Sequence, residues 1–202
     1  MKVLLFNGSR REKGCTYTAL SLIAKELEKA GIDTEIIYIG LNAVNGKLDA
    51  LVKECAAKMK EADGLVIGSP VYYASPTGEI QVFLDRFAGA AGADLRHKPA
   101  AAVASARRAG TSATLDVLYK YLMYNEMPVV TSNYWNMVHG NTPEEVLQDK
   151  EGVQIMETLG KSLAAEMPGS RQKSRGGRTG QTGESDDQFH PLKNPQKVLD
   201  GF

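Results

Sequence analysis

Hydroxyl and basic side chains gather in residues 7–18 (NGSRREKGCTYT), directly after the apolar run 3–6. Ser9, Thr16 and Thr18 supply hydroxyls there, next to arginines and ahead of a predicted helix. Hydroxyls, a guanidinium and the free N–H groups at the start of a helix are groups that bind phosphate. We therefore expect a phosphate site here; the alternative is a polar turn whose hydroxyls only cap a helix.

The same stretch lacks the two commonest nucleotide motifs. It contains no Gly-Lys-Ser or Gly-Lys-Thr, as a Walker A loop requires, and no G-x-G-x-x-G follows the first apolar run. A nucleoside triphosphate site and a built-in dinucleotide site are therefore disfavoured.

A second candidate binding loop is residues 69–78 (SPVYYASPTG), which follows another apolar run. Its two prolines stiffen the backbone, and Tyr72 and Tyr73 offer aromatic surface. A stiff loop of this kind can hold a flat heteroaromatic ligand through backbone amides and aromatic contacts. The alternative is that the tyrosines plug the core or a subunit interface.

A third loop, residues 105–111 (SARRAGT), combines small residues with Arg107 and Arg108. It offers room for a planar ring and charge for a phosphate-bearing partner, although adjacent arginines are usually solvated. We find no triad, H-E-x-x-H or G-x-S-x-G motif, so no side chain is assigned as a catalytic acid, base or nucleophile, and no metal ligand is predicted.

The elements that position these loops alternate regularly. Strands are predicted at residues 3–6, 34–39, 65–67, 100–104 and 127–131. Apolar residues at helical spacing fill the intervals. Alternating strands and helices with short links imply parallel strands joined by right-handed crossovers, with helices on both faces of the sheet. Ligands then bind beyond the carboxyl ends of the strands, where the three loops lie.

Composition divides the 202 residues into two parts. Residues 1–167 carry the alternating pattern and form the predicted domain. Residues 168–202 begin with a Gly-, Arg- and Ser-rich stretch without apolar residues, which we expect to be disordered or to serve as an arm that contacts a neighbouring subunit. Its arginines can also contact RNA, but aromatic residues do not alternate with them.

Charge, hydropathy and cysteine content argue against nucleic-acid-binding, membrane and disulfide- or metal-stabilised proteins. Twenty-four basic residues balance 24 acidic ones, so no net field recruits nucleic acid or an anionic membrane. No apolar segment is long enough to span a bilayer. The two cysteines, Cys15 and Cys55, are too few for a disulfide framework or a four-thiolate metal site. We expect a cytoplasmic protein.

Together the motifs resemble those of a known family. They are Gly8-Ser9-Arg10-Arg11 with Gly14-Cys15-Thr16, and Ser69-Pro70-Val71-Tyr72-Tyr73 running into Gln81-Val82-Phe83-Leu84-Asp85-Arg86. In these residues the chain resembles the NADPH-dependent FMN reductase family over residues 1–167. The resemblance implies an α/β fold of the flavodoxin-like type, a three-layer sandwich with a five-stranded parallel sheet of order 2-1-3-4-5.

The resemblance also implies a cofactor site. Around the FMN phosphate it places Ser9, Arg11, Cys15, Thr16 and Thr18, and around the flavin ring Pro70, Val71, Tyr72, Tyr73, Ala106 and Arg107. Two residues depart from the family pattern: Arg10 stands where proline is frequent, and Cys15 where asparagine is frequent. The related iron-sulfur flavoproteins carry a compact cysteine cluster, which this chain lacks.

The implied activity is that of an oxidoreductase that passes hydride from NADPH or NADH to FMN and on to a small acceptor such as free flavin or a quinone. The alternatives are a flavodoxin-type electron carrier and a flavin-binding sensor without NAD(P)H turnover. Relatives are commonly homodimers or homotetramers. Residues 132–140 resemble a segment of bacterial flavodoxin-like oxidoreductases, where they would shape an acceptor pocket or a subunit contact; His139 stays outside the catalytic set.

Overall fold

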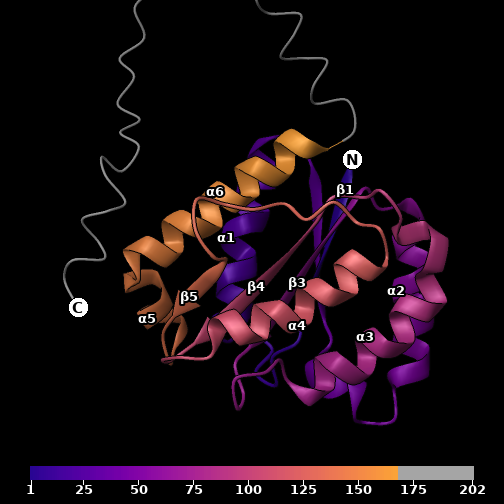
Figure 1. Ribbon diagram of the computed structural model, residues 1–202, viewed down its shortest axis with the longest axis horizontal. Coiled ribbons are helices and arrows are strands. Elements are labelled where there is room, and N and C mark those ends of the chain that lie inside the picture. Colours follow the sequence, from indigo (N-terminus) through magenta and orange to yellow (C-terminus); the bar gives the residue numbers. More distant parts are fainter. Residues whose placement is uncertain (168–202) are drawn as a thin grey trace, which may run out of the picture. The chain divides into compact units, whose positions relative to one another are not determined.

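The computed structural model describes residues 1–167, and the predicted tail, 168–202, lies outside the described residues. The chain alternates strands and helices as the sequence predicts (Figure 1). The strands are β1 (Lys2–Asn7), β2 (Asp33–Tyr38), β3 (Gly64–Pro70), β4 (Ala100–Ala106) and β5 (Met137–His139). The α-helices are α1 (Cys15–Lys29), α2 (Leu48–Glu61), α3 (Gly78–Ala91), α4 (Thr111–Tyr124), α5 (Pro143–Gln148) and α6 (Lys150–Glu166), and two short 3₁₀ turns are η1 (Gly40–Ala43) and η2 (Gly92–Leu95).

The strands form one parallel sheet in the order β2-β1-β3-β4-β5. Helices α2, α3 and α4 cover one face, and α1 and α6 cover the other (Figure 1). The predicted fold class and strand order are therefore confirmed. β1 and β3 are neighbours, and the connection that follows β1 leads to one edge of the sheet while the connection that follows β3 leads toward the other. The ends of these two strands therefore form the expected switch point.

The sheet separates two apolar cores. Along β1 successive side chains alternate between them: Leu4 and Phe6 pack under α2 and α3, while Val3 and Leu5 pack under α1 and α6. Such a strand reads as a continuous apolar run because both of its faces are buried. Phe6 fixes α3 on the sheet through edge-on contacts, its ring centroid lying 5.2 Å from that of Phe83.

The predicted fifth strand at residues 127–131 is wrong. That segment meets only the start of β4, where Val130 N–H donates to Ala100 O (2.8 Å) and a single parallel bridge pairs Val129 with Ala100. Pro128 has no N–H to continue a ladder. The chain then leaves the sheet edge and returns as β5, which pairs with the last residues of β4. Pairing along this edge of the sheet is thus interrupted at residues 131–135 and resumes at Asn136, whose carbonyl accepts from Ala104 N–H (3.0 Å).

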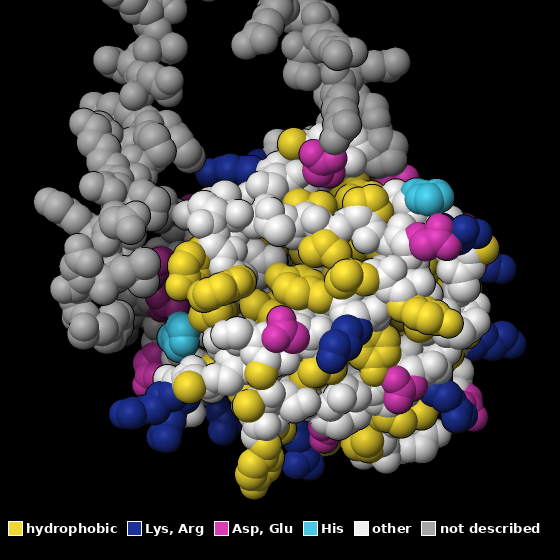
Figure 2. All heavy atoms as spheres, in the orientation of Figure 1, with side chains coloured by type: hydrophobic (Ala, Val, Ile, Leu, Met, Phe, Trp, Pro, Cys, Tyr) yellow, Lys and Arg dark blue, Asp and Glu magenta, His cyan; other side chains and the backbone are white. Residues whose placement is uncertain are grey.

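Figure 2 shows the face that carries α4, where apolar side chains lie among charged ones. Tyr124 and Met123, near the end of α4, are 90% and 68% exposed. None of the helices within residues 1–167 is long and apolar enough to cross a membrane.

Candidate functional site

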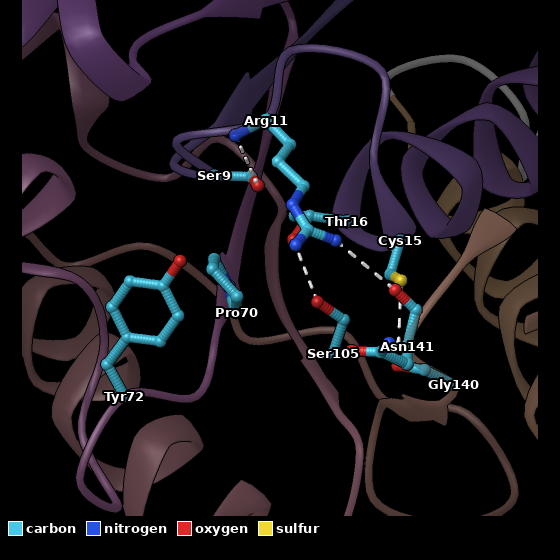
Figure 3. A pocket seen from close by; sticks show the side chains of 9 residues that line it. All are labelled: Ser9, Arg11, Cys15, Thr16, Pro70, Tyr72, Ser105, Gly140 and Asn141. Atoms are coloured by element: carbon cyan, nitrogen blue, oxygen red, sulfur yellow. Dashed lines mark hydrogen bonds between the residues drawn. The ribbon is translucent and has the colours of Figure 1, made fainter.

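A pocket of about 150 Å³ lies at the carboxyl ends of β1, β3 and β4 (Figure 3). Its walls come from four separate stretches of chain: the β1–α1 loop with the start of α1, the end of β3, the end of β4, and the β5–α5 loop. The lining residues are Ser9, Arg11, Cys15, Thr16, Pro70, Tyr72, Ser105, Gly140 and Asn141. This is the edge at which the sheet is expected to bind its ligand.

The β1–α1 loop is held by its own polar side chains and by the neighbouring strand. Asn7 accepts a hydrogen bond from Ser9 N–H (3.1 Å) and donates to Glu12 O (2.7 Å). Gly8 N–H donates to Gly68 O at the end of β3 (2.8 Å). A Cβ added at residue 8 would lie 2.6 Å from Cβ of Ile80, so only glycine lets the loop approach β3 and α3 this closely.

Hydroxyl groups and free N–H groups meet in this pocket. Thr16 Oγ1 and Ser105 Oγ share a buried hydrogen bond of 2.8 Å that joins α1 to β4. Ser9 Oγ accepts from Arg11 N–H (3.1 Å). At the start of α1 the cap residue is Gly14, which has no side chain to accept from the first helical N–H groups. These N–H groups are therefore available to an anion at the positive end of the helix.

The two arginines of the loop take different directions. Arg10 is drawn away, since its Nε lies 3.2 Å from Glu79 Oε1. Arg11 reaches over the pocket, and its Nη1 donates to Asn141 O at a long 3.4 Å. Arg11 has no ion pair with any residue of the 1–167 part, so its charge is available to a ligand.

The Cys15 thiol points toward the β5–α5 loop, where Sγ lies 3.5 Å from Gly140 O, to which it donates. Partial burial raises the pKa of Cys15, although its own backbone N–H and the Arg11 charge act in the opposite direction. The thiol therefore stays protonated at neutral pH and remains a weak donor. Cys55, in contrast, is fully buried in the core beneath α2.

The loop after β3 turns sharply at its aromatic residues. Tyr72 and Ser75 exchange both backbone hydrogen bonds (2.9 and 3.0 Å), and the two residues between them have positive φ angles, 52° for Tyr73 and 56° for Ala74. Left-handed backbone costs a non-glycine residue about 1–2 kcal/mol. The turn presents Tyr73 fully exposed and Tyr72 44% exposed, so within this chain neither tyrosine plugs the core.

Two polar contacts fix this loop in place, the first of them to the β1–α1 loop. Thr77 Oγ1 donates to Gly8 O (2.8 Å), and Thr77 N–H donates to Ser69 Oγ (3.0 Å). On its other side the loop lies against Gly110, where an added Cβ would come within 2.8 Å of Val71. The three predicted loops thus form one connected rim.

The structure brings six of the predicted site residues into the pocket: Ser9, Arg11, Cys15, Thr16, Pro70 and Tyr72. The other five lie around it. Thr18 donates to Gly14 O one turn into α1, and Val71 N–H donates to Ser105 O. Ala106 is buried with its carbonyl accepting from Gly140 N–H, and the side chains of Tyr73 and Arg107 are exposed.

Three lining residues were not among the predicted ones: Ser105, Gly140 and Asn141. Ser105 is a polar residue near the end of an alanine-rich strand, and this position was the signal that could have identified it. Gly140 and Asn141 follow β5. The segment 132–140 was expected to shape an acceptor pocket or a subunit contact, and the structure places its last residue, Gly140, with Asn141 on the wall of the pocket.

Comparison with known proteins gives a consistent assignment. The sequence profile described as NADPH-dependent FMN reductase matches residues 1–142. An iron-sulfur flavoprotein of Methanocaldococcus jannaschii is 30% identical over 185 residues, which cover 81% of this chain and 96% of the relative. An iron-sulfur flavoprotein of Archaeoglobus fulgidus is 34% identical over 98 residues, or 43% of this chain and 48% of the relative.

Solved structures support the fold. An NADH:FMN oxidoreductase named EmoB, in its apo form, superposes with a TM-score of 0.65 at 21% identity and covers 83% of this chain and 90% of that one. A WrbA-like flavodoxin from Agrobacterium tumefaciens gives a TM-score of 0.63 at 15% identity, covering 85% and 97%. At these identities the likeness concerns the fold alone.

Proposed function

The chain belongs to the NADPH-dependent FMN reductase family, and on this premise we propose that it binds FMN in the pocket described above and oxidises NADPH or NADH, passing the electrons to a small acceptor such as free flavin or a quinone. The observation that supports the proposal most strongly is the convergence of hydroxyls, a guanidinium without an ion-pair partner in residues 1–167 and uncapped helix N–H groups in one pocket.

The donor set suits a phosphate monoester. Ser9 and Thr16 contribute hydroxyls, the first turn of α1 contributes backbone N–H groups, and Arg11 contributes the only type of side chain that can donate in a planar fork. Arg11 makes its present hydrogen bond with a backbone carbonyl, at 3.4 Å, and can exchange this weak partner for an anion. Because the pocket is small, about 150 Å³, we place only the phosphate end of FMN in it.

The ring system would lie along the rim formed by the second and third loops. Pro70 and Tyr72 reach from the pocket onto this rim, and the tight turn keeps Tyr73 exposed beside it. When bound, FMN supplies the hydride- and electron-transfer chemistry. The residues of the protein then have to bind the flavin, orient it and shield it from water.

Exposed cations around the rim can favour a phosphorylated nicotinamide cofactor. Arg107 and Arg108 follow β4, are exposed and have no ion pair within the described residues. Their charges can attract the 2′-phosphate of NADPH by long-range steering. We therefore include a preference for NADPH over NADH in the proposal, to be tested by comparing kcat/KM for the two.

An iron–sulfur cluster does not fit the residues of this chain, although the curated relatives are named iron-sulfur flavoproteins. Clusters of the usual kinds need four cysteine ligands. The sequence has two, of which Cys55 is fully buried in the α2 core and Cys15 lines the phosphate pocket. The proposed electron path therefore contains flavin and no cluster.

The proposal is tested by the absorbance spectrum of the purified protein, FMN titration, and anaerobic rapid-mixing with NADPH and NADH. We expect FMN to bind with a flavin spectrum and to be reduced by at least one nicotinamide. FMN binding without reduction would favour the electron carrier or sensor. A colourless protein that neither binds FMN nor oxidises NADPH in its presence would overturn the proposal.

The proposed enzyme is a homodimer or homotetramer, and the groove between α3 and α4 is the surface that would associate. This groove is lined by Asp85, Ala88, Val117, Lys120, Tyr121, Tyr124 and Asn125. Tyr121 Oη on α4 donates to Asp85 Oδ1 on α3 (2.6 Å) across the groove, whereas Lys120 has no ion pair in the described part of the chain, so its charge is available to an acidic group of a second copy.

Sedimentation velocity measures this association. We expect Val117→Glu to shift the protein toward monomer, because it places a charge in the middle of the groove. Leu147→Glu is the matched control, since Leu147 is an exposed apolar residue on α5 (57%) outside the groove. A monomeric wild type, or an oligomer that Val117→Glu leaves intact, would contradict this part of the proposal.

A further inference from the structure

The β5–α5 loop forms one wall of the pocket, and two of its carbonyl groups accept from side chains on the opposite wall. Gly140 O accepts from Cys15 Sγ, and Asn141 O accepts from Arg11 Nη1 (Figure 3). The position of this loop therefore sets both the width of the pocket and the starting position of Arg11.

Three hydrogen bonds hold the start of this loop. Gly140 N–H donates to Ala106 O (3.0 Å), Asn141 N–H donates to Glu145 Oε2 (2.7 Å), and the carboxylate of Asp149 accepts from the residue before them. Asp149 lies between α5 and α6, and its Oδ2 accepts from His139 N–H (2.7 Å) while its Oδ1 accepts from Gly152 N–H (3.0 Å). The first bond reaches the last residue of β5, directly before Gly140 and Asn141 in sequence. The second caps the first turn of α6. Asp149 thus ties a strand end at the ligand edge to a helix that packs on one face of the sheet.

The fit of this carboxylate is tight. The Asp149 side chain is 20% exposed, and the only basic group within 4 Å of it among the described residues is the His139 ring, with Nδ1 at 3.8 Å. A Cβ added at residue 152 would lie 2.2 Å from Asp149 Oδ2 and 3.2 Å from Val138 Cα. Glycine at 152 is therefore required for the carboxylate to reach both N–H groups.

We propose that Asp149 is a positioning residue for the FMN phosphate site. By holding His139 N–H it fixes the end of β5, and together with the bonds to Ala106 and Glu145 it keeps the β5–α5 loop at the distance from α1 that leaves Arg11 and Cys15 in place. It makes no contact with the pocket itself. The role depends on the FMN site proposed above, but the loop contacts on which it rests do not.

Two substitutions test the bond from His139 N–H to Asp149, which we call the clamp, apart from the bond to Gly152 N–H that caps α6. Asp149→Asn has the same shape and remains a good helix cap, but its amide group cannot accept from both N–H groups. Gly152→Ala keeps the carboxylate and displaces it by steric conflict. Val52→Ala, a truncation in the α2 core remote from the pocket, is the control for loss of stability alone.

The first readout needs no flavin. Amide hydrogen exchange of the apo protein should be faster in residues 137–142 of both Asp149→Asn and Gly152→Ala than in wild type, and unchanged there in Val52→Ala. Unchanged exchange in 137–142 of both clamp variants would overturn the proposed role, whether or not FMN binds.

The second readout compares FMN with riboflavin, which lacks the phosphate. We expect FMN affinity to fall about tenfold in both clamp variants, while riboflavin affinity stays within about twofold of wild type. An equal loss for both flavins, or no loss for FMN, would overturn the assignment to the phosphate site. A wild type that binds neither flavin refutes the proposed function instead, and the exchange data then still decide whether Asp149 holds the loop.

Discussion

Replacing Thr16 by valine removes one hydroxyl from the phosphate pocket while keeping the shape of the side chain. Thr16 is 1% exposed, and its Oγ1 has Ser105 Oγ as a partner at 2.8 Å on the pocket wall. A hydrogen bond to a charged group contributes about 1.5–3 kcal/mol, and about 1.4 kcal/mol corresponds to a factor of ten in affinity. We expect the Kd for FMN to rise about 10- to 100-fold in Thr16→Val.

The substitution also leaves the Ser105 hydroxyl without its partner, which costs folding stability about 1–3 kcal/mol. The double variant Thr16→Val/Ser105→Ala removes both polar groups, so its stability should be closer to wild type than that of Thr16→Val alone. Its FMN affinity should remain low. Comparing the single with the double variant therefore separates the loss of folding stability from the loss of FMN affinity.

The assay is isothermal titration with FMN and with riboflavin, together with urea unfolding of each variant. Riboflavin affinity should be unchanged in Thr16→Val because riboflavin has no phosphate. If riboflavin and FMN lose the same factor, or if FMN affinity is retained, then Thr16 does not face the phosphate and the placement of the cofactor is wrong.

Three further predictions follow from packing and burial. Gly8→Ala should lower the free energy of unfolding by about 1–3 kcal/mol in urea titrations, because the new Cβ would lie 2.6 Å from Cβ of Ile80; unchanged stability would mean that the loop can shift freely. Ala74→Gly should raise stability by about 1 kcal/mol, measured as a higher Tm, because glycine relieves the left-handed backbone at φ 56°; a lower Tm would argue against strain in this turn. Burial raises the pKa of Cys55 from 9.0 to about 12, so between these values the unfolded chain releases a proton that the folded chain keeps, and stability falls as pH rises. In Cys55→Ala the free energy of unfolding should fall less between about pH 8 and about pH 10.5 than it does in wild type, as measured by urea titration at both pH values. An equal fall in both proteins would contradict the raised pKa of Cys55.

The first four strands and the flanking helices could be predicted because their signals are local. A strand buried on both faces needs an unbroken apolar run, as in Val3–Phe6, and a helix packed on a sheet needs one apolar stripe, as in Ile80, Phe83 and Leu84. The prediction of the fifth strand at residues 127–131 was wrong for a physical reason. Residues 127–131 have strand-like composition, but whether they pair along their whole length depends on how β4 and α4 are packed, which no local pattern records.

The sequence by itself indicated the fold class through its alternating pattern and the family through its motifs. It also predicted a phosphate site, because Ser9, Arg11 and Thr16 lie close together along the chain at a strand end. Only the tertiary structure decided which distant groups complete the pocket. Ser105 and Thr16, which share a hydrogen bond, are 89 residues apart in the sequence, and Gly140 and Cys15 are 125 residues apart. It also showed why Arg11 and not Arg10 lies at the pocket, since Glu79 on α3 draws Arg10 away. These choices depend on where parallel strand ends meet, and that position is fixed by packing on both faces of the sheet.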